Sequence, residues 1–195
     1  MDGNNTGQTM RWVMPGEEVE AAPPSPAEVA TTLLAEARAR MLAPRVNADP
    51  PLETAAIITL PVFVEVTNWV DAFSVPGCVG AVCVEINATP TLFFNPGEPG
   101  STPIECDPPG TRFNPAGADP SVQAAAPGAC AYEYQMRTGT AGRPDAWPGE
   151  VIVTWDVSWT SNTGAGDSFP PQSLSTSVPR AVDEVQTVVV DRAGG

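Results

Sequence analysis

The chain has 195 residues, with 23 acidic and nine basic side chains, and its formal net charge is −14. A surface this acidic repels phosphate backbones, so we expect no nucleic-acid partner, although acidity of this kind also serves plain solubility. There is no His and every basic residue is Arg, which excludes His-based catalysis, His metal sites and Lys-based phosphate loops.

Residues 1–24 are polar and then Pro-rich, a composition that predicts an extended arm or linker. The arm contains one apolar cluster, Trp12-Val13-Met14. Burying a large apolar side chain yields ~1.5–3 kcal/mol. We therefore expect the cluster to dock, either on its own domain or on a neighbouring subunit.

An amphipathic helix is predicted within residues 25–44. Ser25 and Glu28 can form a capping box, Pro26 suits the first helical position, and Pro44 ends the helix. The apolar residues that share one face are Val29, Ala30, Leu33, Leu34, Ala37 and Met41. Such a stripe either binds a partner or packs on its own domain, and packing is the commoner outcome.

Residues 54–192 are predicted to form a β-sandwich. Apolar and polar residues alternate in six runs, at 58–66, 82–88, 130–136, 151–159, 174–178 and 185–189. Turn clusters rich in Gly, Pro, Asn or Ser separate several of them, at 96–100, 108–110 and 162–168. Short alternating strands with frequent turns indicate an antiparallel sandwich. Because Pro61 has no N–H, we expect the first run at an edge or a bulge.

The four cysteines are Cys78, Cys83, Cys106 and Cys130, and they allow three pairings. Cys78–Cys83 and Cys106–Cys130 are favoured because each pair is close in sequence and flanked by turn residues. Four reduced, buried cysteines are the alternative. Since disulfides form in oxidising compartments, the predicted location is extracellular or at the cell surface.

The first residues after Met1 are polar and contain neither the basic nor the apolar region of a signal peptide. A mature fragment with an added Met, export by another route and a cytosolic chain would each explain this, and we favour the first. No stretch approaches the roughly 20 apolar residues of a membrane span, so no integral membrane segment is predicted.

No catalytic constellation stands out in the sequence, and we expect no enzyme, no cofactor and no metal site. Glu85, Glu133 and Asp156 fall on the polar faces of predicted strands. Two of them meeting across a groove would suit glycoside hydrolysis. Solvated carboxylates on strand faces are far commoner.

The tryptophans separate into two groups. Trp155 and Trp159 lie on the apolar face of their predicted strand, which favours the core. Trp69 and Trp147 lie beside turns. Exposed and coplanar, they would stack on sugar rings, and this is the basis of an alternative function; otherwise they pack in loops.

Four short segments occur in the same order along the chain as similar motifs in a known family. They are Ala88-Thr89-Pro90, residues 105–111, Cys130-Ala131-Tyr132-Glu133-Tyr134 and residues 153–160. Together they resemble a group of secreted actinobacterial PKD-like proteins, whose domain is an immunoglobulin-like β-sandwich. The resemblance covers roughly residues 25–190 and implies extracellular placement, the Cys106–Cys130 link and a non-catalytic role. Residues 93–100 replace the family's Trp-Asp-x-Gly-Asp-Gly turn.

The predicted function is that of a non-enzymatic secreted or cell-surface PKD-like module that mediates protein–protein interaction or extracellular assembly. An apolar arm or an edge strand can pair with a neighbour by strand addition. The segments expected to take part are Trp12, Val13 and Met14, and Val188, Val189 and Val190. A carbohydrate-binding or glycan-acting module is the alternative, so a glycan partner stays open.

Overall fold

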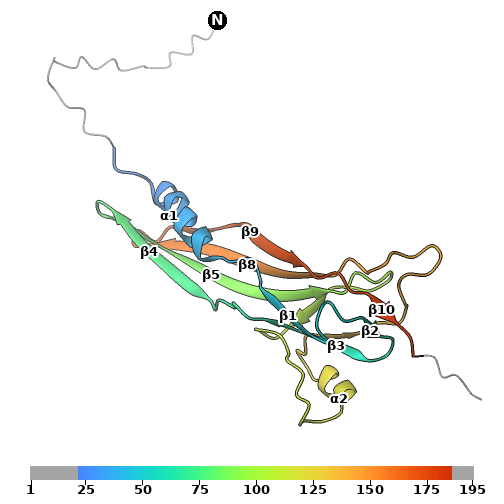
Figure 1. Cartoon of the computed structure of the whole chain (residues 1–195). Helices are drawn as coiled ribbons and strands as arrows, with labels where there is room; N and C mark the ends of the chain where they lie inside the picture. The colour runs from blue at the N-terminus through green and yellow to red at the C-terminus, as the bar shows by residue number, and fades with distance from the viewer. Residues whose placement is uncertain (1–21, 186–195) are drawn as a thin grey trace, which may run out of the picture.

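A five-stranded antiparallel sheet is the largest layer of the protein (Figure 1). The structure is a computed structural model and describes residues 22–185. The sheet follows the order β4 (Phe73–Val79), β5 (Val82–Asn95), β8 (Glu150–Ser161) and β9 (Gly166–Ser177), with β6 (Ile104–Cys106) paired to the second half of β5. The long β5–β8 pairing runs from Val84 opposite Ser161 to Asn95 opposite Glu150.

Two smaller sheets complete the β structure. The three-stranded sheet has the order β1 (Val46–Asp49), β3 (Pro61–Val66) and β7 (Ala131–Glu133), and its pairings are antiparallel. The two-stranded sheet pairs β2 (Ala56–Ile57) with β10 (Val182–Asp183) in parallel. The expected mainly β architecture with antiparallel sheets and one helix ahead of it is confirmed, with this short parallel pair as an addition.

The main core lies on the inner face of the five-stranded sheet. Its buried side chains come from that sheet, from α1 (Pro26–Arg40) and from β3. In Figure 1, α1 lies over one half of the sheet, and β1 and β3 lie toward the other half. Trp155 and Trp159 are both buried in this core, as predicted. A second, smaller cluster is centred on Trp147 and Tyr134.

Helix α1 begins at a capping box and packs its apolar face on the large sheet. The Ser25 hydroxyl accepts the Glu28 backbone N–H, and the Glu28 carboxylate accepts the Ser25 backbone N–H at 2.7 Å, so the predicted capping box is formed. The buried face contains Val29, Ala30, Leu34 and Ala37. Leu33 lies over Gly77 of β4, where a Cβ atom would come within 2.5 Å of the Leu33 Cδ2. The stripe therefore packs on its own domain.

Proline occurs inside β5 at a position that tolerates it. β4 pairs with β5 as far as Ala88, and the β6 pairing begins at Leu92. Pro90 lies between these two partners and faces Trp155 of β8 on the other side. A residue without an N–H fits this gap because β5 has no strand partner there on the side of β4 and β6.

Several predicted strands differ from the observed ones. Strand β3 is central in its sheet, so the expected edge position of Pro61 is wrong; as the first residue of the strand, Pro61 is tolerated there. The run at 58–66 loses its first residues because Thr59 adopts a φ of 67° and turns the chain. Strands β1 and β4 lie outside the predicted runs, and β9 begins at Gly166, inside the expected turn.

The two disulfides join Cys78 to Cys83 and Cys106 to Cys130, which is the predicted pairing. The first joins the two strands of the β4–β5 hairpin, and the second closes the long loop that contains α2 (Pro120–Ala124). Two disulfides indicate an oxidising environment. Within residues 22–185, neither helix is long and apolar enough to cross a membrane.

Candidate functional site

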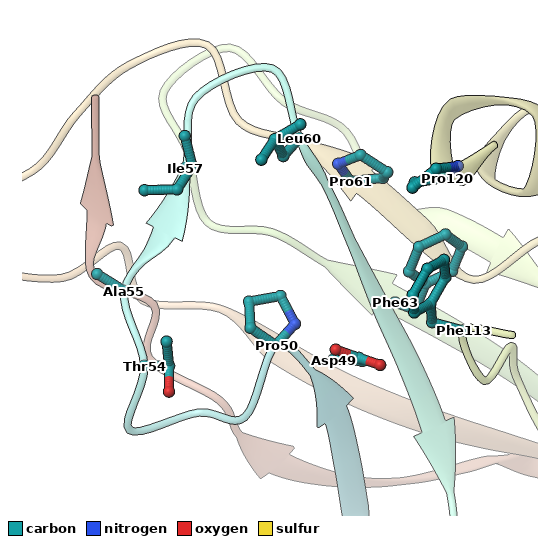
Figure 2. A pocket seen from close by; sticks show the side chains of 10 residues that line it. All are labelled: Asp49, Pro50, Thr54, Ala55, Ile57, Leu60, Pro61, Phe63, Phe113 and Pro120. Carbon is teal, nitrogen blue, oxygen red and sulfur yellow. The ribbon is translucent and has the colours of Figure 1, made fainter. Parts of the chain in front are cut away.

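An apolar groove of about 330 Å³ lies on the outer face of β3. Its lining residues are Asp49, Pro50, Thr54, Ala55, Ile57, Leu60, Pro61, Phe63, Phe113 and Pro120. Figure 2 shows that these side chains come from β1, β2, β3, the start of α2 and the loops on either side of β3. The volume falls in the range of about 300–1,000 Å³ that is typical of binding pockets.

Strand β3 forms the floor of the groove because both of its faces are apolar. Val62 and Val64 point to the interior, whereas Pro61 and Phe63 line the groove. The four residues are all buried. Leu60, just before the strand, stays 54% exposed at the rim. An exposed leucine beside a concave apolar surface is available to a partner.

The loop of residues 107–129 forms one wall. Its first residues extend the sheet along β3: the Val66 N–H donates to the Pro109 carbonyl at 2.7 Å, and the Thr111 N–H donates to the Val64 carbonyl at 2.8 Å. Between them, Gly110 has a φ of 102°, and a Cβ atom there would strike the Val64 oxygen.

This anchoring and the Cys106–Cys130 disulfide together fix the position of Phe113. Its ring stacks on Phe63, with ring centroids 5.4 Å apart and an interplanar angle of 27°. Pro120, at the start of α2, extends the same wall. One wall of the groove is thus a covalently closed loop that carries an aromatic side chain onto the floor.

Residues 50–55 form the opposite wall, and a buried arginine holds them. Arg180 Nη1 donates to the carbonyls of Pro51 and Thr54 at 2.8 and 3.0 Å, and Nη2 donates to the Pro50 carbonyl at 3.1 Å. Burial lowers the pKa of the guanidinium from its usual value. Since Pro50 and Thr54 both line the groove, the hydrogen bonds from Arg180 hold the backbone of this wall in place.

A buried carboxylate lies close to the same region. Glu98 accepts hydrogen bonds from the Tyr132 hydroxyl at 2.6 Å and from the backbone N–H groups of Gln135 and Met136 at 2.9 and 2.6 Å. These N–H groups are therefore bonded to a side chain instead of a strand. The predicted strand at 130–136 stops at Glu133 for this reason.

The two tyrosines next to Glu98 have perturbed acidity. Burial, with the Glu98 hydrogen bond and charge, raises the pKa of Tyr132 to about 12. Burial also raises the pKa of Tyr134, against the opposing effect of the Arg180 charge. Their rings meet edge to face with centroids 5.0 Å apart. Both tyrosines therefore stay protonated and act as structural hydrogen-bond donors.

Asp49 is the charged residue among those that line the groove, and other acidic residues are neighbours of lining residues in the sequence or in the strand register. Glu133 pairs in register with Pro61, and Asp183 pairs with Ile57. Asp119 caps α2 immediately before Pro120. Arg112, which precedes Phe113, is a basic neighbour on this side. The groove therefore suits an apolar ligand that carries a positive charge at one end.

The predicted carboxylates do not converge. Glu85 and Asp156 lie on the exposed outer face of the five-stranded sheet, where Asp156 is opposite Thr89. Glu85 is four residues from Thr89 along β5, which is roughly 13 Å. Glu133 lies in the other sheet, on β7. A glycosidase pair needs its carboxyl groups about 5–9.5 Å apart, and these residues do not provide it.

The two tryptophans proposed for a sugar platform do not form one. Trp147 is 3% exposed, and its indole Nε1 donates to the Met136 carbonyl at 3.0 Å. Trp69 is half-buried, packs against the main core and donates to Asp71 Oδ1 at 3.0 Å. The alternative of loop packing holds for Trp69, while Trp147 belongs to the second core.

The predicted interaction segments, Trp12-Val13-Met14 and Val188-Val189-Val190, lie outside the described residues. The groove itself was not predicted. A signal for it was present: Pro61 and Phe63 are apolar residues at positions that the alternating pattern reserves for the polar face. Among residues 22–185, no group of three His, Cys, Asp or Glu side chains is placed to hold a metal ion.

Comparison with known protein families, with curated proteins and with solved structures gave no match for this chain.

Proposed function

We propose that this protein is a non-enzymatic, secreted or cell-surface PKD-like module that mediates protein–protein interaction, including assembly with copies of itself. The observation that carries the proposal is the apolar groove on β3, whose two walls are fixed independently, one by the Cys106–Cys130 loop and the other by Arg180. A preformed apolar site loses little conformational entropy on binding, which favours recognition of a peptide segment.

Three further observations support an interaction role. Phe113, which stacks on the buried Phe63, and the exposed Leu60 give the groove aromatic and aliphatic contact area, which is typical of interface centres. The predicted catalytic carboxylates lie apart. The disulfides suit an extracellular protein.

Size-exclusion chromatography with light scattering, over a range of concentrations, tests the self-assembly part of the proposal. Pull-down from the medium and envelope of the producing organism tests for another protein. The Leu60→Asp variant, which has a charge at the rim of the groove, serves as the control bait. We expect concentration-dependent association, or a partner that the wild type retains and the variant loses. A strict monomer at high concentration with no such partner contradicts the proposal.

A further inference from the structure

We propose that the groove on β3 receives residues 11–14 of a second copy of this chain, so that copies associate head to tail. The inference rests on the proposed function and names its partner. The segment reads Arg11-Trp12-Val13-Met14: one positive charge followed by three apolar residues. The groove is apolar and contains the carboxylate of Asp49 among its lining residues, so segment and groove are complementary in both properties.

The contacts available to the segment can be assigned by chemistry. Trp12 offers a large aromatic ring to Phe113, whose own ring is stacked on the buried Phe63, and aromatic pairs of this kind add to the gain from burial. Val13 and Met14 suit the aliphatic surface of Leu60 and the neighbouring prolines. Trp and Arg are the residue types that most often dominate interfaces. In this arrangement Arg11 pairs with the Asp49 carboxylate.

The place where α1 begins favours a second copy over the same one. In Figure 1, α1 begins at the end of the molecule where the β4–β5 hairpin turns, whereas β2, β10 and α2 lie toward the opposite end, around the groove. To reach its own groove, the arm would have to return along α1, roughly 22 Å for 15 residues, and then along the segment that leads to β1, and this return would use most of the roughly 45 Å that the arm can span. A neighbour placed end to end presents its groove without that return.

An arm at one end and its receptor at the other is a heterologous contact. Such contacts do not close on themselves unless the rotation between copies happens to form a ring, so they extend into chains. The expected behaviour of the wild type is therefore growth beyond the dimer as concentration rises. The 12 residues between Trp12 and Ser25 allow a span of at most about 45 Å, so that the donor and acceptor domains can remain separate bodies.

The test uses two full-length variants that each damage one side of the contact. Trp12→Ala removes the main apolar group of the arm and leaves the groove intact. Leu60→Asp places a charge at the groove rim and leaves the arm intact. Val79→Asp is the matched control, because Val79 is also an exposed apolar residue, 47% exposed, but lies at the β4–β5 hairpin away from the groove. Circular dichroism verifies that each variant is folded.

Each variant alone should associate at least tenfold more weakly than the wild type, and Val79→Asp should associate like the wild type. Mixed one to one, Trp12→Ala and Leu60→Asp should form a heterodimer, because one supplies a working groove and the other a working arm. That heterodimer should not grow further. Analytical ultracentrifugation with one variant fluorescently labelled measures it.

A charge exchange gives a second measurement that does not depend on Leu60. Arg11→Asp and Asp49→Arg should each weaken association, and the double variant should restore it at the wild-type net charge. Asp156→Arg, an exposed aspartate on the far sheet, controls for the change in net charge.

The outcomes separate this inference from the proposed function. A wild type that assembles, together with variants that neither weaken association nor complement each other, overturns the arm-in-groove contact and leaves assembly standing. A wild type that stays monomeric while the groove variant loses a different protein overturns only the self-partner. A monomer that retains no partner overturns both.

Discussion

The hydroxyl of Tyr132 donates a 2.6 Å hydrogen bond to the buried carboxylate of Glu98, 34 residues earlier in the chain. The same carboxylate also accepts the backbone N–H groups of Gln135 and Met136. One side chain thereby ends a strand, fixes the path of the next loop and satisfies three donors.

Replacing Glu98 should therefore be costly. Glu98→Ala leaves three donors without their acceptor, and we expect a loss of ~2–4 kcal/mol of unfolding free energy. Glu98→Gln keeps an acceptor oxygen for the backbone N–H groups and should lose about 1 kcal/mol. Urea unfolding with the disulfides intact measures both. Equal stability of the alanine variant and the wild type would contradict this assignment.

The tyrosine titration should be unusual because the pKa values of both tyrosines of the chain are raised. Burial and Glu98 hold the pKa of Tyr132 at about 12, and burial raises that of Tyr134 as well. Absorbance at alkaline pH should therefore show no tyrosine ionising near 10 in the folded protein. Glu98→Gln should move the pKa of Tyr132 back toward 10, though not fully, because burial is the larger cause.

The same pKa shifts predict how stability depends on pH. The folded state holds these protons more tightly than the unfolded state, so the contribution is fully present below pH 10. It is lost as pH rises through the folded pKa, which for Tyr132 means between about 10 and 12. Unfolding curves at pH 8, 10 and 11.5 test this. A gain in stability across that interval would show the opposite sign.

Arg180 should control the wall of the groove formed by residues 50–55. Arg180→Met removes the donors of three carbonyl groups, and we expect a loss of ~2–4 kcal/mol. Arg180→Lys retains the charge, but one ammonium does not reproduce the planar fork of a guanidinium, so an intermediate loss is expected. Hydrogen exchange at the Thr54 and Ala56 amides should accelerate in both variants. Arg38→Met, at an exposed arginine, is the control.

The two disulfides should contribute unequally. In the loop-entropy account, closing the loop between Cys106 and Cys130 contributes ~3.5 kcal/mol, against ~2 kcal/mol for Cys78 and Cys83. Alanine pairs at each position, compared by urea unfolding, test this order. Loss of the longer link should also free Phe113, so that self-association weakens. Removing the hairpin link should leave association unchanged.

The parts of the fold that could be predicted are those whose signals are local. Helix α1 follows from its capping box and its apolar stripe, and β8 follows from five apolar residues at period two. Strand β4 was missed because Pro76 and Gly77 interrupt the alternation, yet an edge strand tolerates a proline.

The groove depends on contacts that no local pattern contains. Arg180 reaches carbonyl groups that lie 126–130 residues earlier, and Phe113 reaches Phe63 across 50 positions of sequence. The loss of strand after Glu133 likewise depends on a carboxylate 37 residues away from Gln135. Tertiary context of this kind overrides alternation, which is why the strand was predicted too long.

Strand β9 is an edge strand of the five-stranded sheet, and no strand among residues 22–185 pairs with its outer side. Phe169 pairs with Val157 and Gln172 with Trp155, so the consecutive prolines 170 and 171 form a bulge opposite a single residue of β8. Two missing N–H donors and a local bend prevent an incoming strand from adding along this edge. The consequence is that edge-to-edge aggregation along β9 is disfavoured, although β9 is one of the longest strands of the protein.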